Sequence, residues 1–288
     1  MDSNLVRRVA FAAVAIPLAL GVVWYGGMPL ALLVSAIAWL GTRELFDLAR
    51  RQGIQAARAF GLGIAALLPI LTYLERTWSQ ARNVLLNAWP YLGALAVLGV
   101  MTWALWRRAP TDRPLPAVSV TFFGVLYAAA LPTFLLDIRF GGFGDRSWTA
   151  TWLVFFPLVV TWVCDTAAMF AGRAIGGAKL APVVSPGKTR VGAVAGVVGA
   201  VAVAPLYNPL ALAPHGIVLS PLQALAFAGI LSVVGQVGDL AESLFKREVG
   251  QKDSSALIPG HGGVLDRFDS LYFVLPVAAM LYRLFGVA

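Results

Sequence analysis

Long apolar runs recur along the whole of this 288-residue chain. A helix needs roughly 17–25 apolar residues to cross a bilayer, and hydropathy predicts nine of these runs as membrane spans. Several of the nine are short. Backbone polar groups inside a bilayer must pair within their own segment, so each run is expected to be a helix. The predicted spans are 9–25, 28–42, 59–74, 90–106, 117–136, 150–172, 191–206, 221–238 and 271–286.

Composition agrees with a chain built mainly from membrane spans. Hydrophobic residues make up 59% of it and charged residues 12%, which lies outside the usual range of soluble globular proteins. The spans and their short loops leave no stretch for a separate soluble domain. We therefore expect an all-α integral membrane protein with one domain over 1–288, in which 1–149 supplies N-terminal spans and 150–288 carries the chemistry.

Positive charge is distributed unevenly between the loops. If nine spans alternate, 17 of the 22 Lys and Arg residues fall on one side. By the positive-inside rule that side is cytoplasmic, which puts the N-terminus inside and the C-terminus outside. The net charge of +8 then favours anionic lipid headgroups of the bilayer rather than nucleic acid. We therefore expect a multi-pass protein located in a bacterial inner membrane.

Glycines recur in the predicted span 191–206. Gly192, Gly196 and Gly199 follow one another at intervals of four and three residues. Small residues at such intervals let two membrane helices approach closely. This pattern predicts helix packing rather than a binding site.

The richest polar segment of the chain runs from 238 to 269. Its first part places Asp239, Glu242, Ser243, Lys246 and Arg247 on one helix face, because they follow at i, i+3, i+4, i+7 and i+8. A solvated helix end with internal salt bridges would explain that face alone. The glycine-rich turn that follows, around 260–263, has little reason to exist in a plain connector.

Two carboxylates in this segment, Asp239 and Asp266, are predicted to come from two helices that converge at one depth, where they can bind divalent cations. Mg²⁺ usually takes one or two protein carboxylates and completes its shell with water and phosphate oxygens. One or two divalent cations are therefore expected, and a monovalent second cation is left open. The alternative for Asp266 is a structural ion pair with its neighbour Arg267.

Two further polar segments are expected on the same side. Asp165 interrupts an apolar span, where an ionised carboxylate costs at least ~2.5–3.5 kcal/mol, so it either pairs with Arg173 or lines a polar cavity. The segment 185–190 precedes a span and contains Ser185, Lys188, Thr189 and Arg190. Hydroxyls and cations near a helix N-terminus suit phosphate, although a basic loop can also serve only to set topology.

Taken together, these motifs resemble the phosphatidate cytidylyltransferase family, also called CDP-diacylglycerol synthases. The resemblance is carried by Ser243-Leu-Phe-Lys246-Arg247, by Lys252-Asp253-Ser254, and by the run from Pro259-Gly-His261-Gly-Gly to Asp266-Arg267-Phe-Asp269. It covers roughly 160–270, whereas the first half is similar only in being hydrophobic. Gly187 and Arg190 depart from residues common at their positions in the family.

The resemblance implies transfer of a cytidylyl group from CTP to phosphatidic acid in an Mg²⁺-dependent reaction of phospholipid synthesis. Asp239 and Asp266 would then be the metal ligands. Catalytic roles would fall to Asp239, Lys246, Arg247, Lys252, His261, Asp266 and Arg267. Substrate would be bound by Asp165, Ser185, Lys188, Thr189, Arg190 and Asp269. A homodimer is left open.

Two other functions compete with this one. A CTP-dependent polyprenol or lipid kinase would share the CTP-binding residues but phosphorylate an alcohol. An ion-coupled transporter could use Asp165, Asp239 and Asp266 along a path through the membrane. The transporter is disfavoured because the polar residues gather on one side and the two halves contain no matching broken helices.

Overall fold

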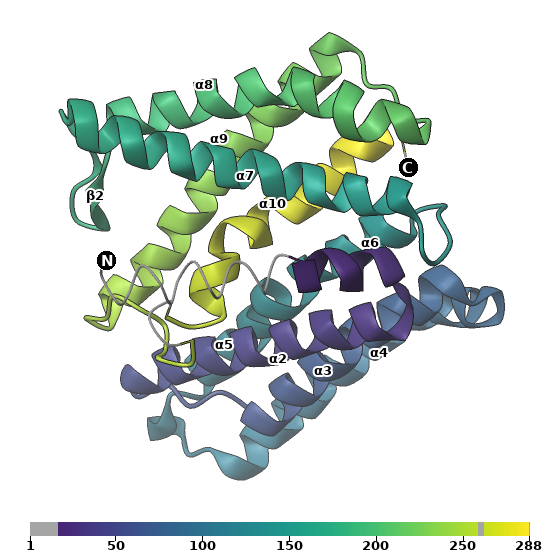
Figure 1. Ribbon diagram of the computed structural model, residues 1–288. Helices are drawn as coiled ribbons and strands as arrows, with labels where there is room; N and C mark the ends of the chain where they lie inside the picture. Colours follow the sequence, from purple (N-terminus) through teal and green to yellow (C-terminus); the bar gives the residue numbers. More distant parts are fainter. Residues whose placement is uncertain (1–16, 259–261, 288) are drawn as a thin grey trace.

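The computed structural model describes residues 17–258 and 262–287 (Figure 1). A helical stretch at 17–25 precedes a bundle of long helices. Their bounds are α2 (Gly27–Arg51), α3 (Arg58–Thr77), α4 (Ser79–Arg107), α5 (Pro114–Val125), α6 (Phe134–Phe140), α7 (Trp148–Ile175), α8 (Arg190–Tyr207), α9 (Pro221–Glu248) and α10 (Leu265–Leu284). Short π and 3₁₀ turns over 126–133 join α5 to α6, so that these two form one continuous apolar segment.

Within the described residues, seven helical segments are long and apolar enough to cross a membrane. They are Gly27–Arg51, Arg58–Thr77, Ser79–Arg107, Pro114–Phe140, Trp148–Ile175, Arg190–His215 and Pro221–Glu248. This agrees with an all-α polytopic membrane protein. Two predicted spans are not among the seven: 9–25 is described only from 17 onward, and α10 carries charged residues in its first two turns and its last. The count of nine and the sidedness of the two ends stay predictions.

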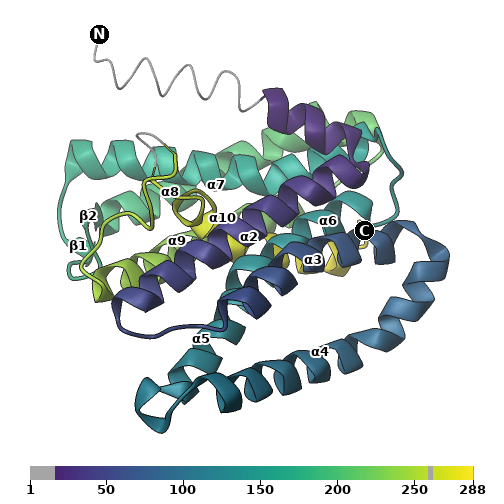
Figure 2. The same ribbon diagram turned by 90° about the horizontal axis from the view of Figure 1, so that it is seen from below.

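The outer surface of the bundle is apolar, as a bilayer requires. Helix α4 runs along the edge of the molecule, apart from most of the bundle in Figure 2. Its side chains Tyr91, Leu95 and Leu105 are 73%, 63% and 75% exposed. An exposed apolar face of this length would be unstable in water, so it supports the membrane assignment.

The predicted all-α architecture lacks one element that the structure contains, a small β-hairpin after α7. Helix α7 ends at Gly176 and Gly177, whose φ angles of +70° and +93° turn the chain back. Strands β1 (Lys179–Ala181) and β2 (Ser185–Thr189) then pair antiparallel. The hairpin forms because this segment lies outside the apolar runs and its backbone groups satisfy one another across the turn.

Four helices that carry polar motifs pack around a stack of aromatic rings. Phe156 of α7 stacks on Tyr207 of α8 and on Phe227 of α9, with both centroid distances 4.6 Å. Tyr282 of α10 lies 4.8 Å from Phe227. Such offset stacks add to the apolar burial of the rings. The stack therefore fixes α7, α8, α9 and α10 relative to one another.

Glycines bring α7 and α8 into close contact, as their spacing predicted. A Cβ atom at Gly196 would lie 2.9 Å from both the carbonyl oxygen and Sγ of Cys164, and one at Gly192 would lie 2.7 Å from the carbonyl oxygen of Ala168. No side chain fits at either position without moving α7. The backbones of the two helices are therefore held close together.

We predict that Gly196→Leu destabilises the protein, by about 1–3 kcal/mol as expected for overpacking, because the added side chain must separate α7 from α8. Thermal unfolding in detergent would measure this. Val198→Leu is the matched control, since Val198 lies on the same helix and is 62% exposed. Equal melting temperatures for the two variants would contradict the prediction.

Candidate active site

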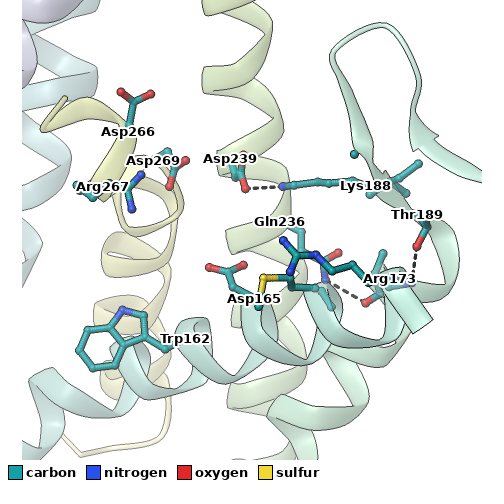
Figure 3. A pocket seen from close by; sticks show the side chains of 17 residues that line it. Trp162, Asp165, Arg173, Lys188, Thr189, Gln236, Asp239, Asp266, Arg267 and Asp269 are labelled. Carbon is teal, nitrogen blue, oxygen red and sulfur yellow. Dashed lines mark hydrogen bonds and ion pairs between the residues drawn. The ribbon is translucent and has the colours of Figure 1, made fainter. Parts of the chain in front are cut away.

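A polar cavity of about 630 Å³ opens between α7, α8, α9, α10 and the hairpin (Figure 3). The residues that line it all lie between 162 and 269. They are Trp162, Asp165, Ala168, Met169, Gly172, Arg173, Leu180, Gly187, Lys188, Thr189, Gly192, Ala193, Gln236, Asp239, Asp266, Arg267 and Asp269. The cavity thus joins the three polar segments that the sequence separates.

Carboxylates reach the cavity from three helices. Asp165 comes from α7, Asp239 from α9 and Asp269 from α10, and Figure 3 shows them around one space. Asp239 forms an ion pair with Lys188 at the end of the hairpin and accepts a hydrogen bond of 3.3 Å from the Ser243 hydroxyl. The pair joins β2 to α9 across the cavity.

The two alternatives for Asp165 are separated by the structure. Among the ion pairs of the described residues, none joins Asp165 to Arg173, and both side chains line the cavity. The cavity-lining alternative is therefore confirmed. A carboxylate in an apolar helix is tolerated here because it faces polar space rather than lipid.

Asp266 lies at the edge of the cavity in a dense set of donors. Its Oδ1 accepts from Lys246 Nζ at 2.6 Å, and its Oδ2 accepts from the Ser254 amide and hydroxyl, both at 2.8 Å, and from the Gly263 amide at 2.7 Å. Burial raises the pKa of the Asp266 carboxyl, but the Lys246 ammonium and the two amides outweigh burial and hold this pKa below its usual value. Asp266 is therefore an anion at neutral pH.

Lys246 is buried beneath the cavity rather than on its wall. Its ammonium donates to Glu242 Oε2 at 3.0 Å and to Asp266 Oδ1 at 2.6 Å. The helical face predicted from the sequence thus forms, and it joins α9 to the first turn of α10. A buried cation between two carboxylates fixes their positions.

Other predicted residues lie away from the lining. Arg247 donates to the backbone carbonyl oxygens of Val184 and Gln251, each at 3.0 Å, and so ties the hairpin to the end of α9. Three predicted residues, Ser185, Arg190 and Lys252, lie in the described chain outside the cavity lining. His261 lies outside the described residues. The functional roles of all these residues stay predictions.

Three lining side chains with hydrogen-bonding groups were not predicted as site residues: Trp162, Gln236 and Arg173. Gln236 lies one turn before Asp239 and donates to the Ala193 carbonyl at 3.3 Å, which joins α9 to α8. Trp162 lies one turn before Asp165 on α7. The signal that could have found both is the interval of three residues that places them on the face of a known site carboxylate.

Charge in the lining is mixed, with a small excess of acid. The cationic side chains are Arg173, Lys188 and Arg267. The carboxylates are Asp165, Asp239, Asp266 and Asp269. Within the described ranges, no cluster of three or more acidic, His or Cys side chains is arranged to hold a metal by itself. A cation here would need further ligands, such as water or phosphate oxygens, as Mg²⁺ commonly takes.

Comparison with known proteins agrees with this geometry. Residues 6–285 match the cytidylyltransferase family. A phosphatidate cytidylyltransferase of Brucella suis is 38% identical over 99% of this chain and 94% of its own length. One from Bacillus subtilis is 30% identical over 97% and 98%, and a chloroplastic enzyme of Arabidopsis thaliana is 35% identical over 99% and 73%. The chain belongs to the cytidylyltransferase family.

Proposed function

We infer that this protein transfers the cytidylyl group of CTP to phosphatidate, which forms CDP-diacylglycerol and pyrophosphate. The observation that carries this inference is the cavity, where cations from α7, β2 and α10 meet carboxylates from α7, α9 and α10 at one end of an apolar bundle. Family membership and relatives named phosphatidate cytidylyltransferase over nearly the whole chain support it.

The reaction needs charge neutralisation more than proton transfer. An oxygen of the lipid phosphate attacks the α-phosphorus of CTP, and the bond from that phosphorus to the bridging oxygen of pyrophosphate breaks. The nucleophile is already an anion, so no strong general base is required. Arg173, Lys188 and Arg267 line the cavity, and they would reduce repulsion between the two anionic substrates and stabilise the leaving pyrophosphate.

Asp239 and Asp266 are proposed to hold Mg²⁺, which when bound neutralises charge on the substrate phosphates. The donor arrangement supports this assignment. Oδ1 of Asp266 accepts one described hydrogen bond, from Lys246, which leaves a lone pair for a cation, whereas Oδ2 accepts three. Asp165 and Asp269 face the same space and would support the metal or the cytidine.

The end of the bundle that holds the cavity is proposed to face the cytoplasm, where CTP is available. The hairpin, the last turn of α9 and the start of α10 gather there in Figures 1 and 2. The last turn of α2 brings Arg50 and Arg51 to the same end. This concentration of cations agrees with the positive-inside rule. A bacterial inner membrane stays the proposed location.

The central prediction is that purified protein, incubated with CTP labelled at the α-phosphate, phosphatidic acid and Mg²⁺, transfers label into the lipid extract. CTP labelled at the γ-phosphate should leave the lipid unlabelled, because that phosphate departs in pyrophosphate. The reverse result, with label only from the γ-position, would establish the competing lipid kinase. Absence of labelled lipid from either substrate would refute both.

Removal of divalent cations should stop the reaction, because the cavity holds more carboxylates than cations and cannot neutralise CTP unaided. We expect EDTA to abolish lipid labelling and excess Mg²⁺ to restore it. In the Asp239→Asn variant, lipid labelling should not be restored at the Mg²⁺ concentration that suffices for the wild type. Full labelling in EDTA would contradict the proposed role of the metal.

Lys188→Gln should lower kcat/KM by about 10²–10³-fold, the range found when one donor to a developing oxyanion is removed. The ion pair with Asp239 that this substitution removes is partly exposed and contributes little to stability, so the melting temperature should change little. Arg51→Gln is a matched control, because Arg51 is an exposed cation at the same end of the bundle and lies outside the cavity lining. Similar kcat/KM values for both variants would show that Lys188 has no special role.

A further inference from the structure

A buried carboxylate from the N-terminal half of the chain reaches the base of the active site. Glu44 lies on α2 and is only 4% exposed. Its Oε1 accepts from the Ser255 hydroxyl at 2.7 Å and the Val264 amide at 3.1 Å. Its Oε2 accepts from the Ser254 hydroxyl at 3.0 Å and the Leu265 amide at 2.7 Å. Every described donor to Glu44 thus belongs to the segment 254–265, more than 200 residues away in sequence.

These contacts give α10 the N-terminal cap that its own sequence does not supply. The cap position is Val264, whose side chain makes no capping hydrogen bond. The first amides of a helix need acceptors, and a negative charge there is favoured by the helix dipole. Glu44 provides both from another helix. Four donors also offset the desolvation of a buried carboxylate.

Glu44 is connected to Asp266 through a shared hydroxyl. The Ser254 hydroxyl lies 3.0 Å from Glu44 Oε2 and 2.8 Å from Asp266 Oδ2, and its single proton can be donated to only one of them at a time. Position 263 has no room for a side chain, because a Cβ atom there would overlap both Ser254 Oγ and Glu44 Oε2. The two carboxylates therefore cannot move independently.

We propose that Glu44 is a positioning residue for the cytidylyl transfer reaction. By holding Ser254, Ser255 and the first residues of α10, it sets where Asp266, Arg267 and Asp269 lie in the cavity. It lies outside the lining itself. The proposal rests on the proposed function, and it gives the N-terminal half of the chain a defined part in the site.

Glu44→Gln tests this because it preserves side-chain shape while replacing one acceptor oxygen with an NH₂ donor. We expect kcat for lipid labelling to fall about 10–100-fold, the range typical when a partner that orients a metal ligand is lost, with a smaller change in KM for CTP. Without substrate, amide hydrogen exchange should become faster in 254–268 and stay unchanged in α3 and α4. Ser255→Ala, which removes one donor and keeps Glu44, should show both effects more weakly.

Glu75→Gln is the matched control. Glu75 is also buried, at 7% exposed, but it lies on α3, accepts from Trp89 Nε1 and lines no part of the cavity. We expect it to lower the melting temperature without lowering kcat per folded molecule. An equal loss of kcat in Glu75→Gln, or a loss in Glu44→Gln without faster exchange in 254–268, would show a general packing effect and overturn the proposal.

Wild-type protein assayed in parallel distinguishes a failure of the proposed function from a failure of the positioning role of Glu44. If it labels no lipid, the proposed function fails. If the wild type labels lipid and both Glu44→Gln and Ser255→Ala keep its kcat, the positioning role of Glu44 fails while the proposed function stands.

Discussion

Fixed placement of Asp266 is the constraint on which the rest of the site depends. Its carboxylate joins α9 through Lys246, accepts from Ser254 and Gly263 before α10, and contacts α2 indirectly through the Ser254 hydroxyl. Each of these donors is directional, and most of them are buried. A buried polar network of this kind has few alternative arrangements, because any partner that moves leaves a charge unsatisfied. The cavity wall formed by α10 is therefore also held in a fixed position.

The membrane helices hold the residues of this network at one depth. The aromatic stack of Phe156, Tyr207, Phe227 and Tyr282 aligns α7 to α10, and the glycines of α8 let its backbone approach α7. Apolar packing alone would not specify the chemistry. It brings residues separated by more than a hundred positions to one cavity, whose carboxylates and cations are in near balance.

Much of this could be predicted from the sequence, for identifiable reasons. The helical spans follow from apolar runs that have one stable conformation in lipid. The residues Asp165, Lys188, Thr189, Asp239, Asp266, Arg267 and Asp269 stood out because charge and hydroxyl groups are rare in such a chain, and the structure places them all at the cavity. Glu44 was missed because a single acidic residue near Arg43 and Asp47 resembles an ordinary helix end. The hairpin at 179–189 was missed because its strands are only three and five residues long and no periodic pattern marks them.

The apolar runs of the sequence were sufficient to predict a helical membrane protein, and its C-terminal motifs indicated the family. Which charged groups meet depends on how the helices pack in three dimensions. Lys246 was expected to have a catalytic role and lies outside the cavity lining, between Glu242 and Asp266. Glu44 of α2 supports Asp266 through the shared Ser254 hydroxyl. The physical reason is that hydropathy and spacing are local properties of the chain, whereas the partner of a buried charge is set by how the helices pack across hundreds of residues.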